Sequence, residues 1–223
     1  MLPAKAFIFD LNGTMIDDME YHTIAWHSIL NDDLKAGLSR DEVRREMYGK
    51  NEELLGRVFG EGRFTAEEAE AISMKKERSY QKAFLPELKL IDGLGDFLER
   101  ARVRGIKLGI GTAAIPFNVN FVVDNLSIRS YFQAIVTADD VKISKPHPET
   151  FLRAAADMGI APADCVVFED APKGVEAASK AGMRCAVLTT MHGPEDFAAF
   201  NNVIGYVADY TDPLLGQLMA DSF

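Results

Sequence analysis

From residue 88 onward, the sequence alternates between apolar runs of strand length and amphipathic stretches of helix length. The expected strands cover residues 106–110, 134–137, 165–168, 185–188 and, as an edge strand, 203–207. The expected helices cover residues 93–104, 117–126, 149–158 and 173–181. Strands that alternate with helices are joined by crossover connections, so this pattern predicts an α/β fold with a doubly wound parallel sheet.

An earlier apolar run, Ala6–Phe9, is too short for a helix and has the character of a strand buried on both faces. Residues 16–84 are instead rich in helix-forming residues, with breaks at glycines. Within them, Thr65 and Glu68 have capping-box spacing ahead of a helix that extends towards Tyr80. We therefore predict a core domain of residues 1–15 and 88–223, and an inserted all-helical domain of residues 16–87.

Composition restricts the class of protein. The 223 residues are 48% hydrophobic with a formal net charge of −10, which argues against binding to a nucleic-acid backbone. No stretch has the length of a membrane span, and the N-terminal residues do not form a signal-peptide core. We expect a soluble cytoplasmic protein, a monomer or weak dimer. Cys165 and Cys185 lie in expected interior strands, which favours buried free thiols over a disulfide.

Polar residues follow the expected strands at the points where these end. They are Asp10 and Asn12, then Thr112 and Ala113, then Lys145, and finally Glu169 and Asp170. Because the carboxyl ends of parallel strands meet at one edge of a sheet, where open α/β sheets bind ligands, we expect these residues to converge.

Each of these residue types has a functional and a structural interpretation. Asp10 either contributes to a site or only caps the next segment, and Thr112 either faces an anion or only caps a helix. Lys145 is restricted in direction by the following proline, although single lysines are usually solvated. The adjacent carboxylates of Glu169 and Asp170 are costly to bring together without a cation, which indicates a metal site.

Taken together in this order, the strand-end residues resemble the haloacid dehalogenase-like superfamily. The resemblance is to the branch that includes β-phosphoglucomutase and small-molecule phosphatases. It is carried by Asp10-Leu11-Asn12-Gly13-Thr14, Thr112, Lys145 and Glu169-Asp170, and it covers essentially the whole chain. The stretch from Asp17 to His22, with Ala25-Trp26, is similar to the entry into that branch's helical cap domain.

The resemblance implies phosphoryl transfer through an aspartyl phosphate, with Asp10 as the nucleophile. It implies Mg²⁺ held by Asp10, the backbone carbonyl of Asn12, and Asp170, with Glu169 as a ligand or its neighbour. It further implies that Thr112, Lys145 and nearby backbone N–H groups, including that of Ala113, hold the phosphoryl oxygens.

For the cap domain, the resemblance implies closure over the site and recognition of a small phosphorylated metabolite. His22 and Trp26 are expected at its hinge. Lys50 and Lys76 are candidates for substrate contact, although a structural role is at least as consistent with the sequence for both lysines.

Asn12 departs from the family pattern, which usually has a second aspartate there as general acid and base. An amide neither donates nor accepts an acidic proton. Three explanations stay open: a substrate whose leaving group needs little protonation, another proton donor such as His22, or an impaired protein that only binds ligands. Asn12 also precedes Gly13, a pairing prone to deamidation.

The first functional hypothesis is therefore a Mg²⁺-dependent phosphohydrolase, with activity limited by Asn12. A β-phosphoglucomutase-like isomerase is an alternative, although Lys50-Asn51-Glu52-Glu53 offers no arginine for a second phosphate. A catalytically impaired binding protein is the third. Dehalogenation fits less well, because Gly13-Thr14 and Glu169-Asp170 are typical of the metal-dependent phosphotransferases.

Overall fold

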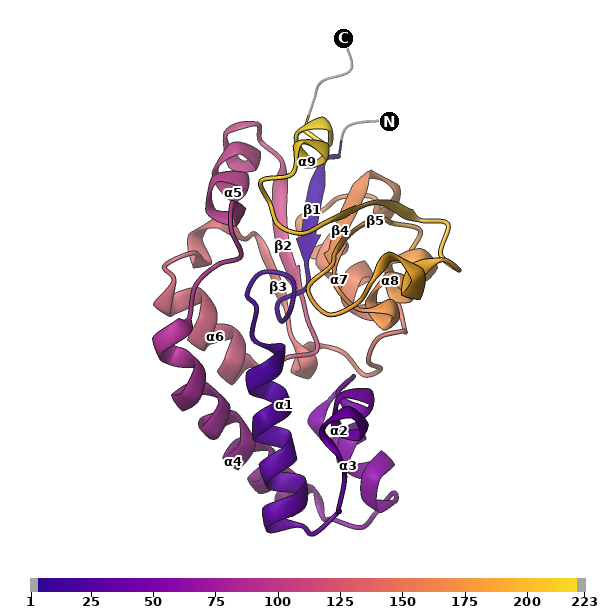
Figure 1. The fold of residues 1–223 in the computed structure, drawn as a ribbon. Coiled ribbons are helices and arrows are strands. Elements are labelled where there is room, and N and C mark those ends of the chain that lie inside the picture. The colour runs from indigo at the N-terminus through magenta and orange to yellow at the C-terminus, as the bar shows by residue number, and fades with distance from the viewer. Residues whose placement is uncertain (1–3, 220–223) are drawn as a thin grey trace. The chain divides into compact units, whose positions relative to one another are not determined.

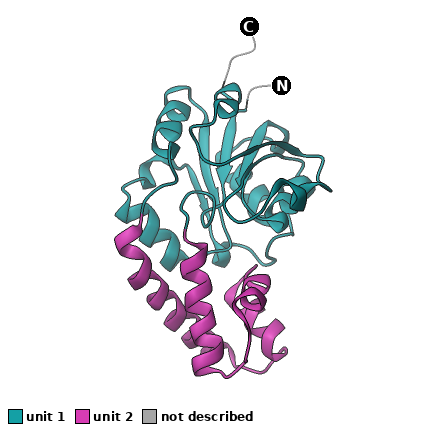
Figure 2. Ribbon diagram, in the orientation of Figure 1, with its two compact units in different colours: residues 1–17, 89–223 teal, residues 18–88 magenta. Residues whose placement is uncertain are grey.

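The computed structural model describes residues 4–219 and divides the chain into two compact units (Figures 1 and 2). One unit comprises residues 1–17 and 89–223, and the other comprises residues 18–88. The sequence placed the two junctions at nearby positions, after residues 15 and 87. Each unit has its own hydrophobic core, so we describe the two separately.

The first unit contains a six-stranded sheet in the described residues, and all its strand pairs are parallel. The strand order is β3-β2-β1-β4-β5-β6. The strands are β1 (Ala6–Phe9), β2 (Lys107–Gly111), β3 (Ala134–Val136), β4 (Cys165–Glu169), β5 (Arg184–Leu188) and β6 (Val203–Val207). The order reverses at β1, which pairs with β2 on one side and β4 on the other, as doubly wound sheets do. The predicted fold class is confirmed.

The helices of this unit begin and end within one residue of the sequence prediction where a helix was expected. They are α5 (Leu94–Val103), α6 (Pro116–Asn125), α7 (Glu149–Met158), α8 (Pro172–Lys180) and the short α9 (Pro213–Gln217), which the sequence did not indicate. Glycine stops account for part of this accuracy: Gly159, for example, terminates α7 in the left-handed conformation with φ of 69°.

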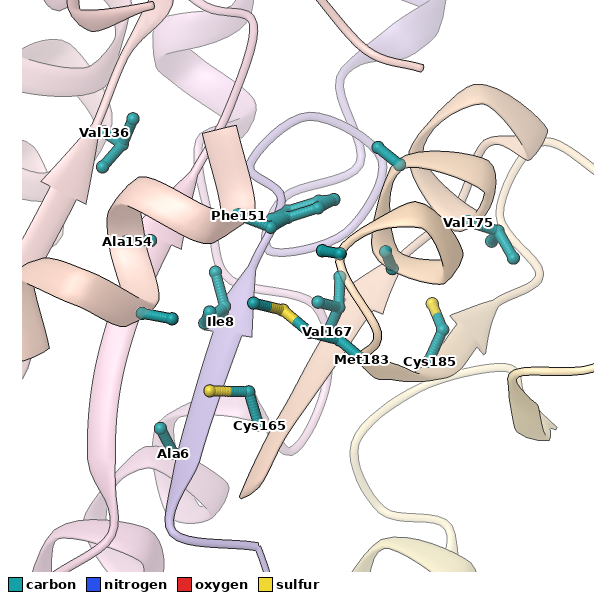
Figure 3. Close-up of a cluster of buried hydrophobic side chains, with 14 of the residues drawn as sticks. Ala6, Ile8, Val136, Phe151, Ala154, Cys165, Val167, Val175, Met183 and Cys185 are labelled. Atoms are coloured by element: carbon teal, nitrogen blue, oxygen red, sulfur yellow. The ribbon is translucent and has the colours of Figure 1, made fainter. Parts of the chain in front are cut away.

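Side chains of β1 alternate between two hydrophobic layers. Ala6 and Ile8 belong to a buried cluster with residues of α7 and α8 (Figure 3). Phe7 and Phe9 lie on the opposite side, where Phe9 stacks on Phe168 with ring centroids 4.7 Å apart. Full burial on both faces explains why this strand reads as a continuous apolar run. Cys165 and Cys185, also buried in the sheet, are free thiols as predicted.

The second unit is helical. It contains α1 (Met19–Ser28), continued by a π-helical turn over Ile29–Asp33, then α2 (Arg40–Glu46), α3 (Asn51–Phe59) and α4 (Ala66–Phe84). The predicted capping box starts α4: the Glu68 carboxylate accepts the Thr65 N–H at 2.8 Å, and the Thr65 hydroxyl accepts the Glu68 N–H at 3.2 Å. No helix in residues 4–219 is both long enough and apolar enough to span a membrane.

Candidate active site

Two adjacent strands, β1 and β4, bring the acidic candidate residues together at the reversal of the sheet. Asp10 directly follows β1, and its N–H donates to the Phe168 carbonyl at 2.9 Å, which extends the pairing with β4 by one residue. Glu169 is the last residue of β4, and Asp170 follows it. Carboxylate oxygens of Asp10, Glu169 and Asp170 lie within 4.8 Å of one another. The convergence expected from the strand ends is therefore present for these three carboxylates.

Lys145 bridges two of these carboxylates. It lies in the loop between β3 and α7, where the Lys145–Pro146 peptide bond is cis. Its ammonium donates to Asp10 Oδ1 at 2.6 Å and to Glu169 Oε1 at 2.8 Å, and it lies 4.5 Å from the ring centroid of Phe151. The side chain is 7% exposed, so this is a buried ion pair and not the solvated lysine that the alternative interpretation required.

The site carries excess negative charge away from water. Burial favours neutral Lys145, but the carboxylates of Asp10 and Glu169 outweigh it and raise the pKa of the ammonium. Burial, together with the charges of Glu169 and Asp10, raises the pKa of the Asp170 carboxyl well above its usual range. A second cation relieves this repulsion, and three carboxylates are the oxygen donor set that suits Mg²⁺. The residues present therefore fit a divalent cation.

Two glycines allow the acidic residues to approach the backbone. Gly13 has a φ of 72°, and a Cβ at this position would lie 2.1 Å from Oδ2 of Asp170. A Cβ at Gly174, in α8, would lie 1.7 Å from Oε1 of Glu169. Gly13 thus meets two separate requirements, a left-handed backbone and an uncrowded approach by Asp170. Gly174 was not recognised in the sequence, because nothing local marks a glycine that makes room for a carboxylate.

Backbone and hydroxyl donors fix the carboxylates further. The N–H groups of Asp170 and Ala171 donate to Glu169 Oε2 at 2.9 and 3.0 Å. The Thr14 hydroxyl donates to Asp170 Oδ1 at 3.3 Å. These donors orient both acidic side chains without adding a full positive charge, so the site keeps its attraction for a cation.

Thr112 and Ala113 follow β2, the strand beside β1. Thr112 does not cap α6, whose N-cap residue is Ile115. Its hydroxyl accepts the Ala114 N–H at 3.1 Å, and its own N–H donates to the Val136 carbonyl at 3.0 Å. The turn therefore holds a buried threonine at a strand end, the location expected of an anion-binding group.

Asn12 lies half-buried in the turn after Asp10, where it pairs with Ile16 as an isolated parallel bridge. The N–H of Gly13 donates to the Ile16 carbonyl at 2.8 Å. Deamidation requires that nitrogen to attack the Asn12 side chain, so the folded turn opposes the reaction that the Asn-Gly pair favours in an unstructured chain.

In the helical unit, His22, Trp26 and Lys76 gather in one buried cluster. The Lys76 ammonium lies 2.6 Å from His22 Nδ1, 3.0 Å from Glu77 Oε2 and 5.3 Å from the ring centroid of Trp26. Burial lowers the pKa of Lys76, and the carboxylates of Glu77 and Asp18 only partly oppose it.

Lys50 is placed differently from the other candidates in this unit. It is the N-cap residue of α3, and its N–H donates to the Glu53 carboxylate at 2.9 Å. Beside it, Asn51 donates to Glu77 Oε1 at 2.8 Å, which ties the start of α3 to α4. The sequence did not identify Glu77, because a lysine next to a glutamate on a charged helix usually faces solvent.

Comparison with known proteins gives the family. The profile of the haloacid dehalogenase-like hydrolases matches residues 4–182. Beta-phosphoglucomutase of Bacillus subtilis (strain 168) is 35% identical over 195 residues, 80% of each chain. Fructose-1-phosphate phosphatase YqaB of Escherichia coli (strain K12) is 32% identical over 180 residues, covering 79% of this chain and 92% of the phosphatase.

Solved structures agree with the sequence relatives. The crystal structure of beta-phosphoglucomutase from Clostridium difficile superimposes with a TM-score of 0.80 at 26% identity, covering 94% of this chain and 92% of that one. The resemblance inferred from the strand-end residues is confirmed. The chain belongs to the haloacid dehalogenase-like hydrolases, as an enzyme of their phosphatase and phosphotransferase class in the phosphoglucomutase-like branch.

Proposed function

We propose that this protein is a Mg²⁺-dependent phosphohydrolase of small phosphorylated metabolites that works through an aspartyl phosphate. The observation that carries the proposal is the buried cluster of Asp10, Lys145, Glu169 and Asp170 at the reversal of the sheet. Its carboxylates and ammonium provide a nucleophile, a cation and an acidic ligand set within one desolvated site.

Asp10 is the proposed nucleophile. One of its carboxylate oxygens forms a bond to phosphorus, and the bond from phosphorus to the leaving oxygen breaks. Lys145 orients the carboxylate through Oδ1 and neutralises charge that builds up on the phosphoryl group. Thr112 and the Ala113 N–H hold phosphoryl oxygens. Water then hydrolyses the acyl phosphate, which releases inorganic phosphate and restores Asp10.

The metal-holding residues in this proposal are Asp10, Asp170 and the Asn12 backbone carbonyl, with Glu169 beside them. Bound Mg²⁺ supplies the positive charge that lets a carboxylate approach a phosphate dianion. Substitution of the Asn12 side chain leaves this set intact, because residue 12 contributes only its carbonyl.

Asn12 restricts the range of leaving groups. Without an acid at this position, the leaving oxygen departs unprotonated and water attacks the acyl phosphate without a general base, each at a cost of about 10²–10⁴ in rate. We infer that acyl phosphates, phosphoanhydrides and aryl phosphates turn over faster than alkyl phosphates such as sugar phosphates. A substitute proton donor such as His22 is the alternative, and the Asn12→Asp variant distinguishes the two.

The names of the phosphatase relatives, which include fructose-1-phosphate and hexitol phosphatases, support a sugar phosphate as a substrate class, and Asn12 would make turnover of such a substrate slow. In this proposal the helical unit is the cap domain that reads the leaving group, with His22, Trp26, Lys50 and Lys76 as its candidate residues. A cytoplasmic location and a monomeric or weakly dimeric state stay predictions of the sequence.

A β-phosphoglucomutase-like isomerase is the second candidate, and the 35% identity to the Bacillus subtilis enzyme favours it. Such an enzyme must bind a second phosphate in its cap domain. Lys50 and Lys76 are the lysines of the helical unit that the sequence indicates for this role. Failure to form glucose 6-phosphate from β-glucose 1-phosphate would exclude this function.

A panel of phosphorylated metabolites, assayed with Mg²⁺ and again with EDTA, tests the phosphohydrolase. We expect phosphate release that EDTA abolishes and that Asp10→Ala removes. Activity indifferent to both treatments contradicts the proposal. Binding of the same metabolites without any turnover, in wild type and in Asn12→Asp alike, identifies an impaired binding protein instead.

A further inference from the structure

Two side chains from the C-terminal part of the sheet unit hold the turn after Asp10. The Thr190 hydroxyl, just past β5, donates to the Gly13 carbonyl at 2.6 Å. The Tyr210 hydroxyl, past β6, donates to the Thr14 carbonyl at 3.0 Å. Both bonds are between residues more than 170 positions apart. The consecutive carbonyls of Gly13 and Thr14 are therefore held by side chains from outside the turn.

The held segment contacts the acidic cluster directly. The Thr14 hydroxyl donates to Asp170 Oδ1 at 3.3 Å. Asp170 also lies directly against Gly13, because a Cβ at Gly13 would be 2.1 Å from Asp170 Oδ2. Residue 12, whose carbonyl is a proposed metal ligand, immediately precedes the held segment. A displacement of residues 13–14 consequently moves both the Asn12 carbonyl and the Asp170 carboxylate.

Tyr210 is built into the core and not merely placed nearby. It is fully buried, and its ring lies 6.1 Å from that of Phe9 and 5.7 Å from that of Phe168. Its N–H donates to the Asp92 carbonyl at 2.9 Å. A phenol packed against residues of β1 and β4, the strands that lead to Asp10 and Glu169, is suited to set a backbone position accurately.

We propose that Tyr210 and Thr190 are positioning residues that preorganise the Asn12 carbonyl and Asp170 for the metal ion. The inference takes the identity of the ion, Mg²⁺, from the proposed function. It adds a prediction that the proposed function does not make, namely that Mg²⁺ affinity depends on Tyr210 and Thr190. Neither residue belongs to the proposed metal-holding or phosphoryl-holding set. Their effect is on metal affinity, because a turn that is not held must be ordered when the ion binds.

The test measures Mg²⁺ binding by isothermal titration calorimetry, without substrate. Tyr210→Phe removes one hydroxyl and leaves the packed ring, and Thr190→Val removes the other. Loss of one hydrogen bond to a carbonyl corresponds to about a two- to tenfold increase in the Mg²⁺ dissociation constant for each variant. Thr190→Ser keeps the hydroxyl and should bind Mg²⁺ as the wild type does.

Tyr131→Phe is the matched control. Its hydroxyl also forms a hydrogen bond, to Glu99 at 3.2 Å, but Tyr131 precedes β3 and so lies at the opposite edge of the sheet from the strand ends. We expect unchanged Mg²⁺ affinity for this variant. Urea unfolding of each protein measures the accompanying loss of stability.

Wild-type Mg²⁺ affinity in both Tyr210→Phe and Thr190→Val, whatever their stability, overturns the inference and makes these residues purely structural. The same holds if Thr190→Ser weakens binding as much as Thr190→Val. Asp170→Asn separates this failure from failure of the proposed function. If Asp170→Asn binds Mg²⁺ as tightly as wild type, the metal site itself is wrong and the positioning role falls with it.

Discussion

The ammonium of Lys145 lies 2.6 Å from Oδ1 of Asp10, although the two residues are 135 positions apart. The same ammonium lies 2.8 Å from Glu169 Oε1, so a single buried cation joins the ends of β1 and β4. Buried ion pairs of this kind add little net stability when complete, but the loss of one partner leaves an uncompensated charge.

Lys145→Gln should therefore destabilise the protein strongly. We expect its free energy of unfolding to fall by about 3–5 kcal/mol, because Asp10 and Glu169 stay buried without their cation. Urea unfolding monitored by circular dichroism measures this. Lys142→Gln, three residues earlier and exposed, is the control and should leave stability nearly unchanged. Equal stabilities of the two variants would show that Lys145 does not neutralise the site.

Asn12→Asp should raise kcat/KM unequally among substrates, because kcat/KM reports the steps up to transfer of the phosphoryl group to Asp10. A restored general acid is worth about 10²–10⁴ in kcat/KM for alkyl phosphates such as fructose 1-phosphate. Nitrophenyl phosphate should gain much less in kcat/KM, because its leaving group needs little protonation. Steady-state kinetics on both substrates measure the ratio, with exposed Asn201→Asp as the control. No gain on either substrate would mean that another residue, such as His22, carries the proton.

Lys76 makes stability depend on pH in the alkaline range. Its folded pKa is lowered, so between that value and about 10.4, the usual lysine pKa, the unfolded chain binds more protons. The free energy of unfolding should consequently rise with pH across that interval. His22, Glu77, Asp18 and Tyr80 surround this ammonium.

Lys76→Met should abolish that rise. Urea unfolding at several pH values between neutral and about 10 measures the free energy of unfolding of both proteins. Contributions from titratable groups common to both cancel in the difference between wild type and variant. Lys75→Met removes the exposed neighbouring lysine and should leave the slope as it is in wild type. Parallel curves for wild type and Lys76→Met would contradict the burial of this ammonium.

The two cysteines should be unreactive in the folded protein. Burial, with a smaller contribution from Asp164, raises the pKa of the Cys165 thiol to about 11, and burial also raises the pKa of Cys185. Because the thiolate is the reactive form, Ellman's reagent should label both cysteines only after denaturation. Rapid labelling of either one in the native state would show that the sheet opens locally.

The sheet unit was largely predictable, because its signals are local. Short apolar runs and glycine stops located strands such as Cys165–Glu169 and helices such as Glu149–Met158 to within one residue. The identities of the strand-end residues then indicated a cation site, since the carboxyl ends of parallel strands must meet.

The hydrogen bonds that hold the site in place, and the burial of charged residues in the helical unit, were not predictable, because they depend on packing between distant segments. Tyr210 reaches Thr14 across 196 positions, and no periodicity or motif in either stretch marks the pair. Lys76 and Glu77 are 2% and 3% exposed on a helix whose charge pattern suggests a solvated face. Burial of that kind follows from the arrangement of neighbouring helices and not from the local sequence.

The central claim is that Asp10 accepts the phosphoryl group. The side chain of Asn12 cannot activate water, so the acyl phosphate should hydrolyse slowly and accumulate. After brief incubation with acetyl phosphate and Mg²⁺ and an acid quench, mass spectrometry of proteolytic peptides should find one phosphoryl group on Asp10. Asn12→Asp should show less of it, and Asp10→Asn none. Phosphate release without label on Asp10 in the wild-type chain, or a label that persists in Asp10→Asn, would contradict the account.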